Sequence, residues 1–135
     1  MNQRTRYKNC FEKKYKRGDI IIHKFENQDY IKRIIGLPGE KIEIRWNNKG
    51  EYFVYINDKI LDESYVLDNK NWAECKYGTY CRYSKIPDDH YFVMGDNREN
   101  SLDSRFYGAV SKDKIKGRVM RIFYPINRAI DFGRE

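Results

Sequence analysis

A two-residue alternation of apolar and polar side chains is the feature that most constrains this chain. Ile42, Ile44 and Trp46 alternate with charged residues, which is the period of a half-buried β-strand. Residues 47–50, Asn-Asn-Lys-Gly, follow, and Asn and Gly tolerate the positive φ angles of a tight turn. Residues 52–56 then supply a returning strand. This stretch therefore predicts a β-hairpin with one buried face.

Short strands recur along the rest of the chain. We expect strands at residues 20–22, 30–35, 41–46, 52–56, 91–94 and 119–124, separated by turns that contain Gly, Pro, Asn or Asp. Residues 111–116 offer one or two helical turns at most. Residues 62–84 show no sustained period, and we expect them to form an excursion from the main sheet. Many short strands without a long helix predict an all-β fold of antiparallel sheets.

Length and charge indicate the class of protein. The chain has 135 residues, the size of one domain, and Lys plus Arg outnumber Asp plus Glu by 27 to 20, a formal charge of +7. No run approaches about 18 apolar residues, so we expect a soluble domain with no membrane span and no signal peptide. The predicted parts are a basic approach segment (1–17), a β domain (18–124) and a tail (125–135).

Cysteine and histidine are sparse. Cys75 and Cys81 enclose five residues, and a disulfide between them would contribute about 2 kcal/mol by the loop-entropy argument. Such a bridge persists only in an oxidising compartment, and free thiols are the alternative; Cys10 would stay unpaired. No Cys-x-x-Cys occurs, and His23 and His90 stand alone, so we expect no metal site and no cofactor.

Lys32 is chemically unusual because it lies inside a predicted strand. If the face of Tyr30 and Ile34 is buried, Lys32 shares that face, and desolvation lowers the pKa of its amine. A neutral amine is what a general base requires. The alternation by itself favours the other interpretation, in which Ile31 and Ile35 face the core and Lys32 faces water.

A polar loop follows the predicted strand at 91–94. Residues 95–105, Gly-Asp-Asn-Arg-Glu-Asn-Ser-Leu-Asp-Ser-Arg, gather hydroxyl, amide, carboxylate and guanidinium groups. Asp103 and Arg105 can form a charge-assisted pair, and the Ser101 hydroxyl can position another donor. Loops on rigid sheets often carry functional sites. The same composition also fits an ordinary solvated loop of turn-forming residues.

Three stretches resemble, in order and spacing, three successive boxes of the type I signal peptidase family. They are Arg-Gly-Asp-Ile at 17–20, Tyr-Ile-Lys-Arg-Ile-Ile-Gly-Leu-Pro-Gly-Glu at 30–40, and Met-Gly-Asp-Asn-Arg-Glu-Asn-Ser-Leu-Asp-Ser-Arg at 94–105. Gly-Arg-Val at 117–119 resembles the closing strand of that family. The resemblance covers residues 17–124 and implies a partly closed barrel of the signal-peptidase type, with 62–84 as an inserted subregion.

The resemblance implies a serine endopeptidase that removes signal peptides from exported preproteins with a Ser/Lys dyad. Lys32 matches the general base, and Ser101 matches the serine that orients its amine. Tyr30 and Ile31 match positions beside pockets that read small residues in an extended peptide. The residues that match the support of the dyad are Asp96, Asn97, Arg98, Asp103 and Arg105. Some members also have a small disulfide loop similar to the Cys75 and Cys81 spacing.

The box that holds the nucleophile in this family, Ser-Met-x-Pro-Thr, has no match upstream of residue 18. The serines are Ser64, Ser84, Ser101, Ser104 and Ser111, and all of them follow Lys32. Thr5 and Cys10 precede Lys32 but lack the Met-x-Pro context. The same box supplies oxyanion donors in the family. We therefore expect the chain to be inactive as given, as a fragment, a truncated gene product or a paralogue that binds peptides without cutting.

The charge and the resemblance also predict partners. We expect signal peptides of preproteins and an anionic membrane surface, which attracts basic side chains, at the extracytoplasmic face of the cytoplasmic membrane. A nucleic-acid-binding β-barrel is the alternative, because positive charge and aromatic rings suit phosphates and bases. The basic residues are dispersed and no nucleic-acid-binding motif occurs, so we expect no nucleic acid partner.

Overall fold

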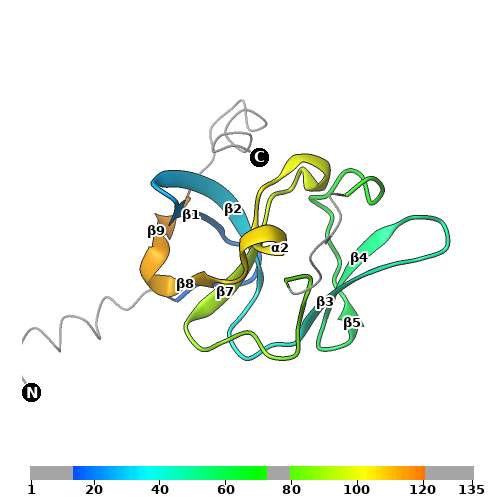
Figure 1. The fold of residues 1–135 in the computed structure, drawn as a ribbon, viewed down its shortest axis with the longest axis horizontal. Coiled ribbons are helices and arrows are strands. Elements are labelled where there is room, and N and C mark those ends of the chain that lie inside the picture. Colours follow the sequence, from blue (N-terminus) through cyan, green and yellow to red (C-terminus); the bar gives the residue numbers. More distant parts are fainter. Residues whose placement is uncertain (1–13, 73–79, 121–135) are drawn as a thin grey trace, which may run out of the picture.

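The structure is a computed structural model that describes residues 14–72 and 80–120. These residues form two antiparallel sheets, a curled one of order β8-β7-β2-β1-β9 and a smaller one of order β5-β4-β3-β6, which lie side by side (Figure 1). The strands are β1 (Ile20–Phe25), β2 (Gln28–Gly36), β3 (Ile42–Trp46), β4 (Tyr52–Ile56), β5 (Lys59–Ile60), β6 (Arg82–Tyr83), β7 (His90–Met94), β8 (Val110–Ser111) and β9 (Ile115–Arg118). The short helices are η1 (Arg98–Asn100), α2 (Ser104–Tyr107) and η2 (Lys112–Lys114). The all-β prediction is confirmed.

The hairpin of β1 and β2 builds the wall that carries Lys32. Its turn is made by Glu26 and Asn27, whose φ angles of 49° and 65° give the two-residue connection that matches strand twist. The resulting register pairs Ile21 with Lys32. Directly paired residues of antiparallel strands project from the same face of the sheet. Because Ile21 is fully buried, the register places Lys32 inside the curled sheet.

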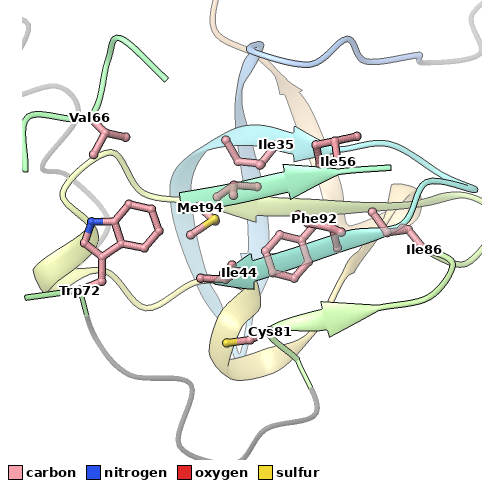
Figure 2. Close-up of a cluster of buried hydrophobic side chains, with 11 residues drawn as sticks. Ile35, Ile44, Ile56, Val66, Trp72, Cys81, Ile86, Phe92 and Met94 are labelled. Atoms are coloured by element: carbon pink, nitrogen blue, oxygen red, sulfur yellow. The ribbon is translucent and has the colours of Figure 1, made fainter. Parts of the chain in front are cut away.

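β7 runs between two hydrophobic cores. Tyr91 and Val93 belong to the cluster inside the curled sheet, whereas Phe92 and Met94 belong to the cluster between the two sheets. This second cluster is drawn in Figure 2 and comprises Ile35, Ile42, Ile44, Val54, Ile56, Val66, Trp72, Cys81, Ile86, Phe92 and Met94. Burial on both faces fixes the end of β7, and with it the start of the polar loop at Gly95.

The two sheets approach each other closely at the end of β2. A Cβ atom added to Gly36 would lie 3.4 Å from Ile42 Cδ1 of β3 in the other sheet, and only 2.5 Å from Ile86 Cδ1 and 3.1 Å from Phe92 Cβ. No side chain larger than hydrogen fits there unless the neighbouring side chains move. Gly36 therefore permits the contact between the sheets.

The final strand differs from its prediction. Val119 and Met120 are not in a strand, and residues 121–124 lie outside the described residues. Instead β9 begins at Ile115, which is 4% exposed and pairs with His23 of β1. Ile115 comes directly after η2. Because Ile115 is buried against the curled sheet, β9 begins at this residue. The predicted helical turns are reduced to the three residues of η2.

The N-terminal end of the described chain is part of the core. Tyr15 is 7% exposed, and its ring packs edge-on against Tyr91 at a centroid distance of 5.4 Å. Arg17 donates two hydrogen bonds to the carboxylate of Glu40, at 2.6 and 2.8 Å. The end of the predicted approach segment therefore packs on the β domain.

Of residues 62–84, which we expected to leave the main sheet, the structure describes 62–72 and 80–84, and β6 within them pairs with β3. Cys81 is buried and disulfide-bonded. Its expected partner, Cys75, lies outside the described residues, as does Cys10, so the pairing remains a prediction. Within residues 14–72 and 80–120, no helix has the length and apolar character needed to cross a membrane.

Candidate active site

Lys32 is buried within the curled sheet, with 2% of its surface exposed. Tyr30 and Ile34, on the same face of β2, are also buried, so the interpretation that turns Lys32 toward water is wrong. Alternation misleads here because β2 has buried residues on both faces: Ile35, on the other face, is buried as well. Removal from water disfavours the charged form of a lysine amine.

Ser101 contacts the Lys32 amine. Lys32 Nζ donates a hydrogen bond to Ser101 Oγ at 3.0 Å, across 69 positions of sequence. Ser101 Oγ also accepts from the Gly95 amide at 3.1 Å and donates to Asp103 Oδ2 at 2.8 Å. The hydroxyl proton is therefore directed to Asp103, and the oxygen acts as an acceptor toward the amine. Ser101 is 5% exposed, so the solvated-loop interpretation of this region is wrong.

Asp103 and Arg105 form a fully buried ion pair. Arg105 Nε and Nη2 each lie 2.9 Å from a different carboxylate oxygen, and the Arg105 amide also donates to Asp103, which caps α2. Burial opposes ionisation of Asp103, but the charge of Arg105 and the hydrogen bonds from Gly95 and Ser101 hold the pKa of Asp103 below its usual range. An ionised carboxylate only accepts hydrogen bonds, which fixes the direction of the Ser101 hydroxyl.

A second ion pair fixes the start of the loop beside Lys32. Arg33 Nε and Nη2 donate to the two oxygens of Asp96 at 2.9 and 2.8 Å. Next to this pair lies a narrow crevice of about 10 Å³, with room for about one water-sized group. Its lining residues are Ile20, Ile31, Lys32, Arg33, Gly95 and Asp96. The crevice therefore lies between β2 and the start of the polar loop.

The remaining predicted support residues differ in their placement. Arg98 is buried and donates to the Gly95 carbonyl at 2.7 Å and to both oxygens of Glu63. Asn97 is exposed, and its side chain does not cap η1, so the structure does not bring it to Lys32. Sequence analysis missed Glu63, which lies 35 positions from Arg98 in a stretch without a period. The sequence signal that could have pointed to Glu63 is Arg98 itself, because an arginine that is buried needs a carboxylate partner.

An aromatic wall that the sequence did not predict lies beside the lysine. His23 is fully buried, its ring is stacked 5.8 Å from that of Tyr30, and its Nε2 lies 2.9 Å from the Tyr107 hydroxyl. Burial lowers the pKa of His23 to about 4, and the nearby charge of Lys32 acts in the same direction. A cavity of about 530 Å³ adjoins this wall, lined in part by His23, Phe25, His90 and Tyr107.

No metal centre is formed by the part of the chain that the structure describes. There, no three His, Cys, Asp or Glu side chains are grouped so that they could hold an ion. Lys32 is the buried amine of this region, and Asp103 is its buried carboxylate.

Comparison with known proteins identifies the family. The family model described as "Signal peptidase, peptidase S26" matches residues 1–124. The chain belongs to the signal peptidase family. Every residue of the site described above lies within the matched range, so the resemblance seen in the three sequence boxes is confirmed.

Relatives in this family share the sequence at moderate identity. Signal peptidase I of Bacillus amyloliquefaciens is 43% identical over 119 residues, which are 84% of this chain and 60% of that protein. Signal peptidase I S of Bacillus subtilis (strain 168) is 42% identical over 118 residues, which are 84% and 61% of the two chains. This chain therefore spans about three-fifths of the length of these signal peptidases.

The fold agrees with a solved signal peptidase. A crystal structure of signal peptidase I from Enterococcus faecalis V583 matches with a TM-score of 0.64 and 34% sequence identity, covering 80% of this chain and 98% of the other. The antiparallel sheets with almost no helix are thus shared with a signal peptidase.

Proposed function

We propose that this chain carries the lysine half of a Ser/Lys-dyad signal peptidase site and binds the signal peptides of preproteins. Lys32 is the general base, and Ser101 orients its amine. The observation that supports this most directly is the buried contact of 3.0 Å between Lys32 Nζ and Ser101 Oγ. The names of the relatives, which are signal peptidases, agree with the proposed substrate class.

In the proposed reaction a neutral Lys32 amine takes the proton of an attacking hydroxyl, whose oxygen forms a bond to the peptide carbonyl carbon. The proton then passes to the leaving amine when the peptide bond breaks. Ser101 cannot be the attacking group, because its proton is directed to Asp103 and its oxygen accepts from Lys32 and Gly95. The crevice beside Ile31 is the place that we assign to the attacking hydroxyl.

The other serines offer no replacement nucleophile within these 135 residues. Ser104 is fully buried, and its oxygen accepts the Val93 amide at 2.9 Å, which ties it to the start of α2. Ser111 Oγ accepts from the Asp113 amide at the start of η2. Ser64 and Ser84 are exposed. We therefore propose that a polypeptide of this sequence binds signal peptides without cutting them.

The substrate is proposed to bind as an extended strand beside β2. Ile31 is half-buried and lines the crevice next to the lysine, and the Tyr30 ring centroid lies 5.7 Å from Lys32 Nζ. A shallow site of this kind suits small side chains before the cut, such as Ala-x-Ala. The formal charge of +7 supports an additional attraction to an anionic membrane surface at the extracytoplasmic side.

The test separates binding from cleavage. A fluorescent signal peptide with an Ala-x-Ala site is titrated with the purified chain, beside the same peptide with both alanines replaced by lysine. We expect the first to bind and the second not to bind. Equal binding of both, or of neither, would contradict the substrate assignment.

Cleavage is assayed with a preprotein that carries the Ala-x-Ala site, with Lys32→Ala as the control. We expect no product from either protein, because no serine precedes Lys32 and the sequence has no match to the Ser-Met-x-Pro-Thr box that supplies the nucleophile and the oxyanion donors in this family. Product at that site which disappears in Lys32→Ala would overturn the proposed inactivity. Cys10 would then be the first residue to replace.

A further inference from the structure

Arg98 joins the loop that carries Ser101 to the excursion between β5 and β6. Its guanidinium carbon lies 4.7 Å from the ring centroid of Trp72, and its terminal nitrogens donate to the two oxygens of Glu63 at 3.1 and 2.6 Å. The Arg98 side chain is 0% exposed and that of Glu63 is 5% exposed. A guanidinium removed from water in this way requires a carboxylate partner, so the two side chains hold each other in place.

The third nitrogen of Arg98 reaches the backbone next to the proposed dyad. Arg98 Nε donates to the Gly95 carbonyl at 2.7 Å, and the Gly95 amide donates to Ser101 Oγ at 3.1 Å. The Gly95 carbonyl therefore accepts from Arg98, and the Gly95 amide is shared between Ser101 Oγ and Asp103 Oδ2, each 3.1 Å away. A continuous series of contacts thus connects Glu63 to Lys32.

Tyr65 gives Glu63 a second connection to the lysine strand. Its hydroxyl donates to Glu63 Oε2 at 3.0 Å, and the guanidinium carbon of Arg33 lies 4.1 Å from its ring centroid. Burial raises the pKa of Tyr65, and the carboxylate of Glu63 raises it further, so the hydroxyl stays a proton donor. Arg33 is the neighbour of Lys32 in β2. The carboxylate of Glu63 is therefore connected to the region of the dyad by two series of contacts, one through Arg98 and one through Tyr65.

We propose that Glu63 is a positioning residue for the dyad, which acts through Arg98 and Gly95 to hold Ser101 against the Lys32 amine. The proposal rests on the proposed function, since it assigns Glu63 a part in the same site. Its geometric content can be tested without catalysis. Glu63, Tyr65 and Trp72, which lie in the described part of the chain between β5 and β6, then support the active site.

The test measures two properties of the purified chain by NMR: hydrogen exchange of the Gly95 amide, and the titration midpoint of the Lys32 amine. In Glu63→Gln we expect the Gly95 amide to exchange at least about tenfold faster, relative to the amide of Ile34. The Ile34 amide donates to the Asp19 carbonyl oxygen and serves as the internal reference. We also expect the Lys32 midpoint to fall by about 0.5 pH unit, a threefold change, because a loosened Ser101 accepts less well from the ammonium form.

Arg98→Lys tests whether the hydrogen bonds of Arg98 to Gly95 and Glu63, and not its positive charge alone, position Ser101. Lysine keeps the positive charge opposite Glu63, but it lacks the planar fork that reaches Gly95 and both carboxylate oxygens at once. We expect it to give the same two changes. The matched control is Glu40→Gln, which breaks a similar two-bond pair with Arg17. This control should leave both readings at their wild-type values.

Wild-type exchange at Gly95 in both Glu63→Gln and Arg98→Lys would overturn the proposal, as would equal changes in Glu40→Gln. If Glu63→Gln does not give a folded spectrum, Arg98→Lys decides the question. Signal-peptide binding by the wild-type chain is measured in parallel. Failure of that binding with the expected Gly95 result would refute the proposed function and leave the positioning contact intact.

Discussion

Ser101 donates its hydroxyl proton to Asp103 across 2.8 Å, and this contact sets the direction of the whole buried network. Asp103 is kept ionised beside Arg105, so it can only accept. Ser101 Oγ in turn is an acceptor for Lys32 Nζ at 3.0 Å. Hydrogen bonds therefore converge on Asp103 from both sides, and the amine is held by an oxygen that has no proton to offer it.

Replacing Ser101 with alanine should destabilise the fold by about 1–3 kcal/mol, the usual cost of removing one member of a buried hydrogen-bond network. The Lys32 amine and the Gly95 amide each lose an acceptor in this variant. Urea unfolding at pH 7 measures the change. The exposed Ser84→Ala should stay within about 0.5 kcal/mol of the wild type. Equal stability of the two variants would show that the Ser101 contacts are not formed in solution.

Asp103 predicts a loss of stability in acid. Its folded pKa is depressed while the unfolded value is about 3.9, so below roughly pH 5 the unfolded chain binds a proton that the folded chain rejects. The free energy of unfolding should therefore fall as the pH drops from about 5 through the folded pKa. Asp103→Asn should lose about 3–5 kcal/mol at pH 7, because the buried Arg105 loses the charge of its carboxylate partner, and it should show a shallower acid slope.

Asp58 provides the comparison for this acid slope. It forms exposed ion pairs with Lys41 and Arg45, which solvent and salt screen, so Asp58→Asn should leave the free energy of unfolding at pH 7 nearly unchanged. Denaturant unfolding from pH 7 to 3 compares the three proteins. An Asp103→Asn variant as stable as Asp58→Asn at pH 7 would contradict the buried pair.

His23 predicts a separate loss of stability as the pH falls, and this loss begins at a higher pH than the one that Asp103 causes. Burial lowers its pKa to about 4, whereas an unfolded histidine titrates near 6.5. The unfolded chain therefore takes up a proton first, and stability should fall by up to about 3 kcal/mol between pH 7 and pH 4. His23→Phe keeps an aromatic ring against Tyr30 and should remove this slope. The partly exposed His90→Gln should retain it, and a slope that survives in His23→Phe would refute the assignment.

The hairpin of β3 and β4 was predictable because its signal is local. The alternation before the turn and the Asn and Gly in it describe one half-buried ribbon, and the returning strand Tyr52–Ile56 has the predicted bounds. The start of β9 was not predictable in the same way. Ile115 enters the strand because it packs into the curled sheet and pairs with His23, which lies 92 positions away. The residues around Ile115 in the sequence do not indicate its contact with His23.

The site shows the same division. The sequence boxes indicated that Lys32 and Ser101 belong together, but alternation alone turned Lys32 outward, because β2 is buried on both faces at Ile34 and Ile35. Glu63 and His23 escaped notice since neither has a neighbour in sequence that explains its burial. Their partners, Arg98 and Tyr107, come from another part of the chain. Pairing of polar side chains from distant parts of the chain is therefore what the sequence patterns did not reveal.

Lys32→Met should leave the fold as stable as the wild type or make it more stable, by up to about 2 kcal/mol. Methionine fills nearly the same volume without a buried amine, and replacing a buried polar group by an apolar one of similar shape is often neutral or favourable. Ser101 keeps its hydrogen bonds to Gly95 and Asp103 in this variant. Such a result would mean that the amine is retained for chemistry at a cost in stability.

The measurement is the free energy of unfolding in urea at pH 7, with Lys24→Met as the matched control. Lys24 is exposed in β1, so its replacement should change stability by no more than about 0.5 kcal/mol. A loss of more than about 1 kcal/mol in Lys32→Met, with Lys24→Met unchanged, would make the lysine a structural element of the barrel. That outcome would remove the energetic argument for a general base at this position, since a residue that stabilises the fold needs no catalytic reason to be there.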